Sequence, residues 1–140
     1  MLSKTALHAL RAMTVLAELP KGDYAGAVDV AHAIEAPRNY LGKLLQSLSE
    51  VGLVESQKGK GGGFRLAKDA ADITVFDVVD PIDHVSRWQG CFMGQSQCSS
   101  ESPCPVHCRW QAVRDPYMAF LKGTTLADLV RQPTPEPLLV

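Results

Sequence analysis

The run Lys58-Gly-Lys-Gly-Gly-Gly63 places the tightest constraint on how this chain can fold. Its glycines let the backbone turn sharply. The segments on either side, 53–57 and 64–66, mix apolar and polar side chains in the way that strands do. The run therefore predicts a β-hairpin with Lys58 and Lys60 at its tip. It does not match a phosphate-binding loop, because the spacing of glycine, lysine and Ser/Thr in that motif is absent.

Three predicted helices precede the hairpin, over residues 4–19, 28–35 and 38–51. Apolar residues recur at helical spacing in each, with an inward stripe of Leu7, Leu10, Met13 and Ala17 in the first and Leu41, Leu44, Leu45 and Leu48 in the third. Ala36-Pro37 separates the second helix from the third, and Gly52 is well placed to end the third. Two short helices joined by a tight break and followed by a basic hairpin predict a winged helix-turn-helix.

Charge is divided unevenly between the two halves of the chain. Residues 1–68 carry nine Lys/Arg against six Asp/Glu, whereas residues 69–140 carry five against nine. The basic half suits a polyanion such as double-stranded DNA. We expect the DNA contacts to come from the polar face of the third helix and from the hairpin, through Asn39, Tyr40, Lys43, Lys58, Lys60 and Arg65. A surface hairpin with solvated lysines is the alternative for the wing.

The second half contains two further predicted helices. Thr74 with Asp77 three residues later is typical of a helix N-terminus. After a loop at 89–105, apolar residues recur every three or four positions, at Val106, Trp110, Val113, Tyr117 and Phe120. This heptad-like stripe predicts a helix that packs against a second copy, and a symmetric dimer suits a palindromic operator. The alternative is that the stripe packs on the first helix of its own chain.

The cysteines of the chain all fall within residues 91–108, at Cys91, Cys98, Cys104 and Cys108, with His107 between the last two. Only Cys104 and Cys108 are as close as the paired ligands of most zinc sites, so zinc is possible but not favoured. Longer gaps containing glycine suit an iron–sulfur cluster with histidine as one ligand. A thiol redox switch without metal is the third interpretation.

Composition excludes several other classes of protein. Hydrophobic residues make up 46% and charged residues 21% of the chain, as in ordinary globular proteins. The N-terminus lacks the pattern of a signal peptide, and no stretch has the ~18 apolar residues of a membrane span. We therefore expect a cytoplasmic protein without structural disulfides. Asp77, Asp80 and Asp83 have no partner base, so an enzyme is not indicated.

Three segments resemble those of a known family, the IscR/NsrR/RirA group of bacterial winged-helix regulators. Leu48-Ser-Glu-Val-Gly-Leu-Val54 followed by Lys58-Gly-Lys-Gly-Gly-Gly-Phe-Arg-Leu-Ala67 looks like their wing signature. Cys104-Pro-Val-His107 followed by Trp110 is similar to the cluster segment of their iron–sulfur members, and Thr125-Leu-Ala-Asp-Leu-Val130 is similar to their C-terminal end. The resemblance covers residues 2–130. It implies a homodimeric transcription factor, a repressor, that senses iron–sulfur, redox or nitric oxide status through a cluster.

The resemblance also implies a ligand set. Cys91, Cys98 and Cys104 match the three cysteine ligands, although the first gap is longer than is usual. His107 matches the histidine of IscR-type members, which favours a 2Fe-2S cluster; 4Fe-4S is possible. Cys108 is a rival for the fourth position. Nitric-oxide-sensing relatives use a residue from the first helix of the other subunit, where this chain has Leu7, so only the neighbouring His8 could serve.

The expected architecture is mainly α with a small β-hairpin wing and a C-terminal dimerisation helix. A winged helix-turn-helix would occupy residues 1–83 and a cysteine-rich loop residues 84–108. The dimerisation helix and C-terminal segment would occupy 105–130, and a flexible tail 131–140. A metal-free regulator that uses cysteine redox chemistry is the alternative function.

Overall fold

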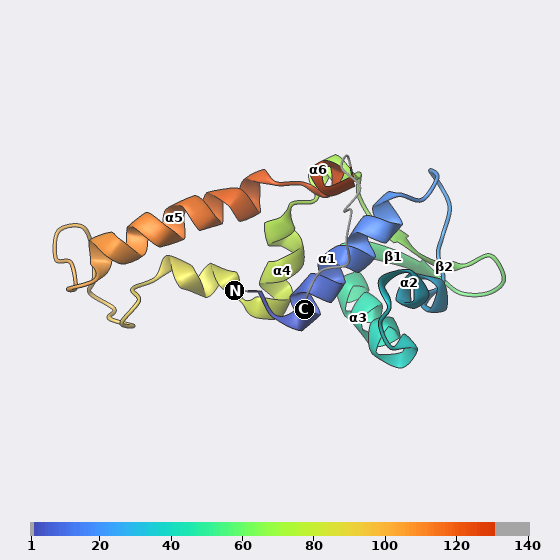
Figure 1. The fold of residues 1–140 in the computed structure, drawn as a ribbon, viewed down its shortest axis with the longest axis horizontal. Helices are drawn as coiled ribbons and strands as arrows, with labels where there is room; N and C mark the ends of the chain where they lie inside the picture. Colours follow the sequence, from blue (N-terminus) through green and yellow to red (C-terminus); the bar gives the residue numbers. More distant parts are fainter. Residues whose placement is uncertain (1, 131–140) are drawn as a thin grey trace.

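The computed structural model describes residues 2–130 and is mainly helical, with a single two-stranded sheet in the described part (Figure 1). This confirms the predicted fold class. The predicted tail at 131–140 lies outside the described residues. The elements, in chain order, are α1 (Lys4–Ala17), α2 (Ala27–Ile34), α3 (Arg38–Glu50), β1 (Val54–Gln57), β2 (Gly63–Leu66), the 3-10 turn Ala70–Asp72, α4 (Val75–Asp83), the 3-10 turn Val85–Gln89, α5 (His107–Gly123) and α6 (Leu126–Val130).

Helix α1 lies at the centre of the fold and packs against α2, α3, α4 and α6. Its buried residues are Ala6, Ala9, Ala12, Met13 and Leu16. Of the predicted inward stripe, Met13 is buried and Leu10 is half-buried but packs against the core, whereas Leu7 and Ala17 are half-buried and lie outside both core clusters. Alanines allow the neighbouring helices to approach α1 closely on several sides, and Leu7 and Leu10 are less buried than these alanines.

The helix-turn-helix consists of α2 and α3. Leu41, Leu44, Leu45 and Leu48 of α3 are all buried, as predicted. Gly52 follows the helix with a φ of 82°, so the predicted left-handed residue at its end is confirmed. Glu35 ends α2 in the same left-handed region, with a φ of 57°. The result is a short, sharp connection that sets α3 against α2.

Strands β1 and β2 form an antiparallel pair with Glu55 opposite Arg65 and Gln57 opposite Gly63. The glycine-rich run is the loop between them, which confirms the predicted hairpin. Gly63 has a φ of 136°, and a side chain there would collide with the carbonyl of Ala25. Ala25 and Phe64 exchange backbone hydrogen bonds of 2.9 and 2.7 Å, so β2 also pairs with the segment before α2. These bonds fix the wing beside the helix-turn-helix.

Helix α4 begins with the predicted capping pair. The Asp77 amide donates to Thr74 Oγ1, and the Thr74 amide donates to the Asp77 carboxylate. At its other end, Asp83 accepts hydrogen bonds from the backbone amide and hydroxyl of Ser3, the N-cap of α1.

Sequence patterns did not separate α6 from α5. The structure divides them at Thr124 and packs α6 against α1.

Helix α5 projects away from the rest of the molecule, and the cysteine loop lies at its far end (Figure 1). Only the C-terminal part of α5 joins the core, where Met118 and Leu121 pack with Val75, Val79 and Val85. Pro116 lies within the helix without ending it. Across residues 2–130, every helix is too short or too polar to span a bilayer.

Candidate metal centre and nucleic-acid interface

The structure brings Cys91, Cys98 and Cys104 together, with their sulfur atoms all within 4.8 Å of one another. Cys91 Sγ lies 3.6 Å from Cys104 Sγ, and the amide of Cys104 donates to Cys98 Sγ over 3.4 Å. Cys104 is buried and the other two are half-buried. Three converging thiols that are partly shielded from water form a site that could hold a metal ion or an iron–sulfur cluster.

The two candidates for a fourth ligand have different environments. His107, the first residue of α5, has its Nδ1 3.3 Å from Cys98 Sγ. Cys108 is exposed and lies outside the thiol group. The one-residue step between them turns their side chains about 100° apart around the helix axis. In this chain, the imidazole of His107 is therefore beside the thiols and the sulfur of Cys108 is not.

The thiols of the group differ in acidity. A hydrogen bond from the backbone of Gln95 is the main cause that lowers the pKa of Cys91 to about 7; a bond from Met93 and the neighbouring thiols add to it, against the effect of desolvation. The Cys104 amide lowers the pKa of Cys98, but desolvation and the adjacent thiols outweigh it, so the net shift is upward. Thiolate is the form that ligates metal, and Cys91 loses its proton more readily than Cys98 does.

Polar and aromatic contacts anchor the N-terminal end of the cysteine loop to α5. Trp110 Nε1 donates to the carbonyl of Gly90 over 3.1 Å, and Arg114 donates to the carbonyl of Gln89 over 2.8 Å. The ring of Phe92 packs against Trp110 with centroids 5.4 Å apart. These contacts bring Cys91 to the N-terminal end of α5, where the helix dipole favours a thiolate.

The predicted DNA-binding residues of the wing fall into two kinds. Lys58 and Lys60 are exposed at the tip of the hairpin. Arg65 instead forms an ion pair with Glu55 over 3.0 Å, and its guanidinium lies 4.6 Å from the centre of the Tyr24 ring. Lys58 and Lys60 extend into solvent, whereas Arg65 already has partners that it would have to share with a phosphate.

The DNA-binding residues predicted on α3 also differ in their exposure to solvent. Asn39 and Lys43 are exposed on one face of the helix. Tyr40 is half-buried, and its hydroxyl lies 3.1 Å from Nδ1 of His8 on α1. Burial, and then the charges of Lys4 and Arg11, lower the pKa of His8, so its ring is neutral near pH 7. In this chain, Tyr40 therefore faces α1, and Nδ1 of His8 is engaged by the Tyr40 hydroxyl.

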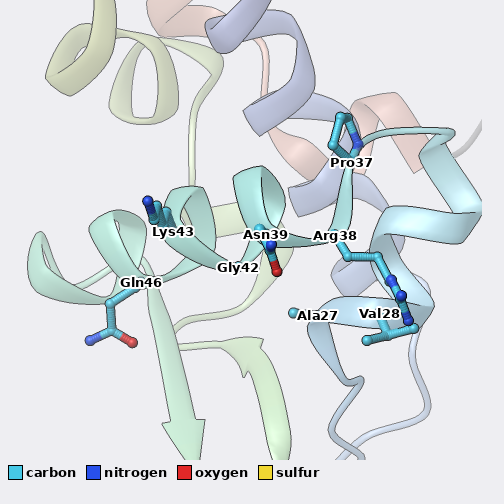
Figure 2. Close-up of a pocket in the computed structure, with 8 residues that line it drawn as sticks. All are labelled: Ala27, Val28, Pro37, Arg38, Asn39, Gly42, Lys43 and Gln46. Carbon is cyan, nitrogen blue, oxygen red and sulfur yellow. The ribbon is translucent and has the colours of Figure 1, made fainter.

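An open hollow of about 780 Å³ lies between α2 and α3 beside the predicted DNA-reading residues (Figure 2). Figure 2 shows Asn39, Gly42 and Gln46 along one side of α3, with Ala27 and Val28 of α2 across from them. Sequence reasoning missed Arg38, Ala27 and Val28 as residues of this surface. For Arg38 a signal was available, since it is the first residue of the third helix and the N-terminal turn of a recognition helix reaches base edges.

A basic wing, a helix-turn-helix with a polar outer face and a cysteine loop outside the DNA-reading part together define a DNA-binding transcriptional regulator. Comparison with known proteins agrees with this class. Residues 2–132 match the Rrf2 family, which is described as iron-dependent transcriptional regulators. The match covers most of the chain, which therefore belongs to the Rrf2 family. Since this is a family of transcriptional regulators, the expectation that the protein is not an enzyme is confirmed.

Individual relatives support the family assignment. The chain is 34% identical over 130 residues to an HTH-type transcriptional regulator of Aquifex aeolicus (strain VF5), covering 91% of this chain and 90% of the relative. It is 33% identical over 122 residues to the HTH-type transcriptional regulator IscR of Escherichia coli O1:K1, covering 85% and 75%. The structure of CymR, the global cysteine regulator of Bacillus subtilis, superimposes with a TM-score of 0.75 at 25% identity, covering 94% and 96%.

Proposed function

We propose that this protein is a homodimeric repressor that binds a palindromic DNA operator and senses iron–sulfur, redox or nitric oxide status through a cluster. The observation that carries the proposal is the convergence of the Cys91, Cys98 and Cys104 sulfurs within 4.8 Å. No other group of described His, Cys, Asp or Glu residues has metal-site geometry. The family description and the relative named IscR favour a cluster over an isolated metal ion.

The donor set fits an iron–sulfur cluster. Thiolates are the usual ligands of such clusters, and a histidine replaces cysteine in some of them. Cys91, Cys98 and Cys104 would hold the cluster, and His107 is the fourth ligand that we favour because its Nδ1 already lies beside Cys98. Once bound, the cluster would supply a group that gains or loses electrons, reacts with nitric oxide, or is lost when iron is scarce.

The identity of the fourth ligand is linked to the type of cluster. A histidine ligand favours 2Fe-2S, whereas four thiolates suit 4Fe-4S. Cys108 could supply the fourth thiolate only if the first turn of α5 rotated, because it is exposed in this chain. His8 of the partner subunit is the remaining alternative, and using it would break the contact between His8 and Tyr40.

The dimer is proposed to form along α5. Val113 and Phe120 are 66% and 57% exposed, so this part of the apolar stripe does not pack on α1 of its own chain. Trp110 and Tyr117 belong to the same stripe and are half-buried. Val106, just before the helix, completes it. A second copy of α5 would cover these side chains, as the heptad-like spacing predicts.

A path connects the cysteine loop with the DNA-reading helix. The C-terminal part of α5 packs on α4, and the last residue of α4, Asp83, is hydrogen-bonded to Ser3 at the start of α1. Helix α1 in turn packs against α3. We propose that the loop at 84–108 acts on the winged helix at 1–83 through this path and through the dimer formed by 105–130. Half-sites about one helical turn (~34 Å) apart tolerate little relative movement of two recognition helices.

DNA contacts are proposed for both parts of the winged helix. Asn39 and Lys43 would meet base edges or phosphates in the major groove, and Tyr40 would support the helix from the side of α1. Lys58 and Lys60 would contact flanking phosphates or the minor groove, with Arg65 at the edge of the wing. Arg38 joins the α3 group because it lines the same hollow as Asn39.

Anaerobic purification tests the proposal. We expect a coloured protein that contains iron and acid-labile sulfide in equal amounts, and whose visible absorption is absent from a Cys98→Ser variant. A colourless protein without iron or sulfide after anaerobic reconstitution would refute the cluster. Zinc alone in the isolated protein would favour the structural-metal interpretation instead.

A metal-free thiol sensor is the second candidate, and one observation favours it. Cys91 Sγ and Cys104 Sγ are only 3.6 Å apart, so modest movement would allow a disulfide between them. In that case, mild oxidation of the iron-free protein would form a bond between these two residues and change operator affinity. If peptide mapping finds this disulfide but a Cys91→Ser variant responds to oxidant as wild type does, the thiol switch is excluded.

A further inference from the structure

Neither the backbone conformation of α3 nor its packing requires a glycine at position 42. It lies in the middle of α3, and its φ is not in the left-handed region. A Cβ at this position would meet only the Ala27 Cβ, at 3.9 Å, which is an ordinary van der Waals contact. Glycine inside a helix is unfavourable relative to alanine. Packing among the described residues therefore gives no reason for the bare backbone at Gly42.

The space in front of Gly42 is the hollow between α2 and α3. The methyl group of Ala27 and the side chain of Val28 form an apolar wall across from Gly42 (Figure 2). Val28 is 52% exposed, and core packing does not account for an aliphatic side chain at this position. The polar rim comes from α3, where Arg38, Asn39 and Lys43 carry two positive charges and an amide. An apolar wall inside a cationic rim suits a small apolar group carried by a polyanion.

We propose that this hollow receives the 5-methyl group of a thymine in the major groove, which makes Gly42, Ala27 and Val28 specificity-determining residues. The inference rests on the proposed placement of α3 in that groove. Thymine is the natural base that presents a methyl group there, and apolar side chains read it by contact. The rim matches the rest of the ligand, because Arg38 and Lys43 can meet phosphates while Asn39 can pair with the edge of an adenine. The absence of a side chain at position 42 lets the base edge come close to the helix backbone.

Deoxyuridine provides the direct test, because it differs from thymidine only by the methyl group. The protein as isolated would first select a duplex from a random pool. Each thymine of that duplex would then be replaced by uracil in turn, and the affinity measured for wild type, Gly42→Ala and Val28→Ala. A Gly123→Ala variant is the matched control, since Gly123 ends α5 with open space around it.

In wild type we expect at least one thymine per half-site whose loss of the methyl group weakens binding about fourfold, the equivalent of burying one methyl group. Gly42→Ala and Val28→Ala should bring this thymine-to-uracil ratio close to one, whereas Gly123→Ala should preserve it. Gly42→Ala should also raise the urea midpoint of unfolding, because alanine favours the helix and has room. A variant that is more stable yet less discriminating separates a recognition role from a structural one.

Three outcomes would overturn the inference. Uracil could replace every thymine without effect, the ratio could survive both substitutions in the hollow, or Gly42→Ala could destabilise the protein. If a duplex is selected but the methyl groups are irrelevant, only this inference fails. If the protein selects no duplex at all, the proposed DNA-reading surface fails with it.

Discussion

At the scale of single residues, the local environment separates side chains of the same type. Cys91, Cys98 and Cys104 converge while Cys108, one residue beyond His107, is exposed. The spacing of these residues predicted sulfur chemistry, but it could not show which side chains meet. That depends on long-range contacts such as the hydrogen bond from Trp110 to Gly90, which closes the loop over twenty residues.

The acidity of Cys91 leads to a prediction about its reactivity in the cluster-free protein. Its pKa of about 7 means that the thiolate forms as the pH rises through 7, and the thiolate is the form that iodoacetamide alkylates. Mass spectrometry of the alkylated peptides should give a pH midpoint near 7 for Cys91 and a markedly higher one for Cys98, whose pKa is raised. Equal rates at the two residues at pH 7 would contradict the assigned environments.

The fourth ligand can be identified by comparing two substitutions. His107→Ala should alter the visible absorption of the anaerobic protein and destabilise the cluster, because Nδ1 of His107 lies 3.3 Å from Cys98 Sγ. Cys108→Ala removes an exposed thiol and should leave the spectrum unchanged. The opposite pattern would assign the fourth position to Cys108. An unchanged spectrum in both variants would direct attention to His8 of the partner subunit.

At the scale of elements, the recognition helix and the wing make different kinds of contact. Residues on α3 line the hollow that we propose to read a base, whereas Lys58 and Lys60 are exposed on a glycine-rich loop where they present positive charge. Side chains of this second kind bind DNA by releasing counterions from phosphates, so their contribution depends on salt and not on sequence.

The wing lysines can therefore be tested by the salt dependence of operator binding. Lys58→Ala and Lys60→Ala should each flatten the slope of log affinity against log salt by about one unit and weaken all sequences alike. Lys21→Ala, at an exposed lysine before α2, is a control that should leave the slope unchanged. If the slope is unaffected in both wing variants, the lysines of the hairpin are only solvated.

The helices and strands were the most predictable part of the fold. Leucine periodicity located α3, and the pair Thr74 and Asp77 located the start of α4, because these signals are local. The prediction of the buried face of α1 was less accurate, since α1 is contacted from several sides and three alanines share its buried face with Met13 and Leu16. Helix α6 was missed as an element because five residues contain too little periodicity. The hollow at Gly42 depends on how closely two helices pack, which sequence alone does not specify.

At the scale of the whole molecule, α5 extends from a core that it joins only at one end (Figure 1). Its outer apolar side chains, Val113 and Phe120, have no cover within residues 2–130. A dimer along this helix would bury them and bring two cysteine loops and two winged helices into one assembly.

A charge placed on this face should separate the protomers. Val113→Glu combined with Phe120→Glu is expected to yield a monomer in sedimentation velocity and to reduce operator affinity strongly, because paired half-sites are lost. Ala119→Glu adds a charge to the opposite, exposed face of α5 and should leave the dimer intact. A dimer that survives the double substitution would exclude α5 as the interface.

If the state of the cysteine site controls DNA binding, operator affinity must differ between protein with and without the cluster. Anaerobic protein would be divided into cluster-loaded and chelator-stripped portions, and both would be titrated against the same selected duplex at fixed salt. We expect affinities that differ by tenfold or more, with a Cys104→Ser variant fixed at the value of the stripped form. Equal affinities for the two portions would contradict it.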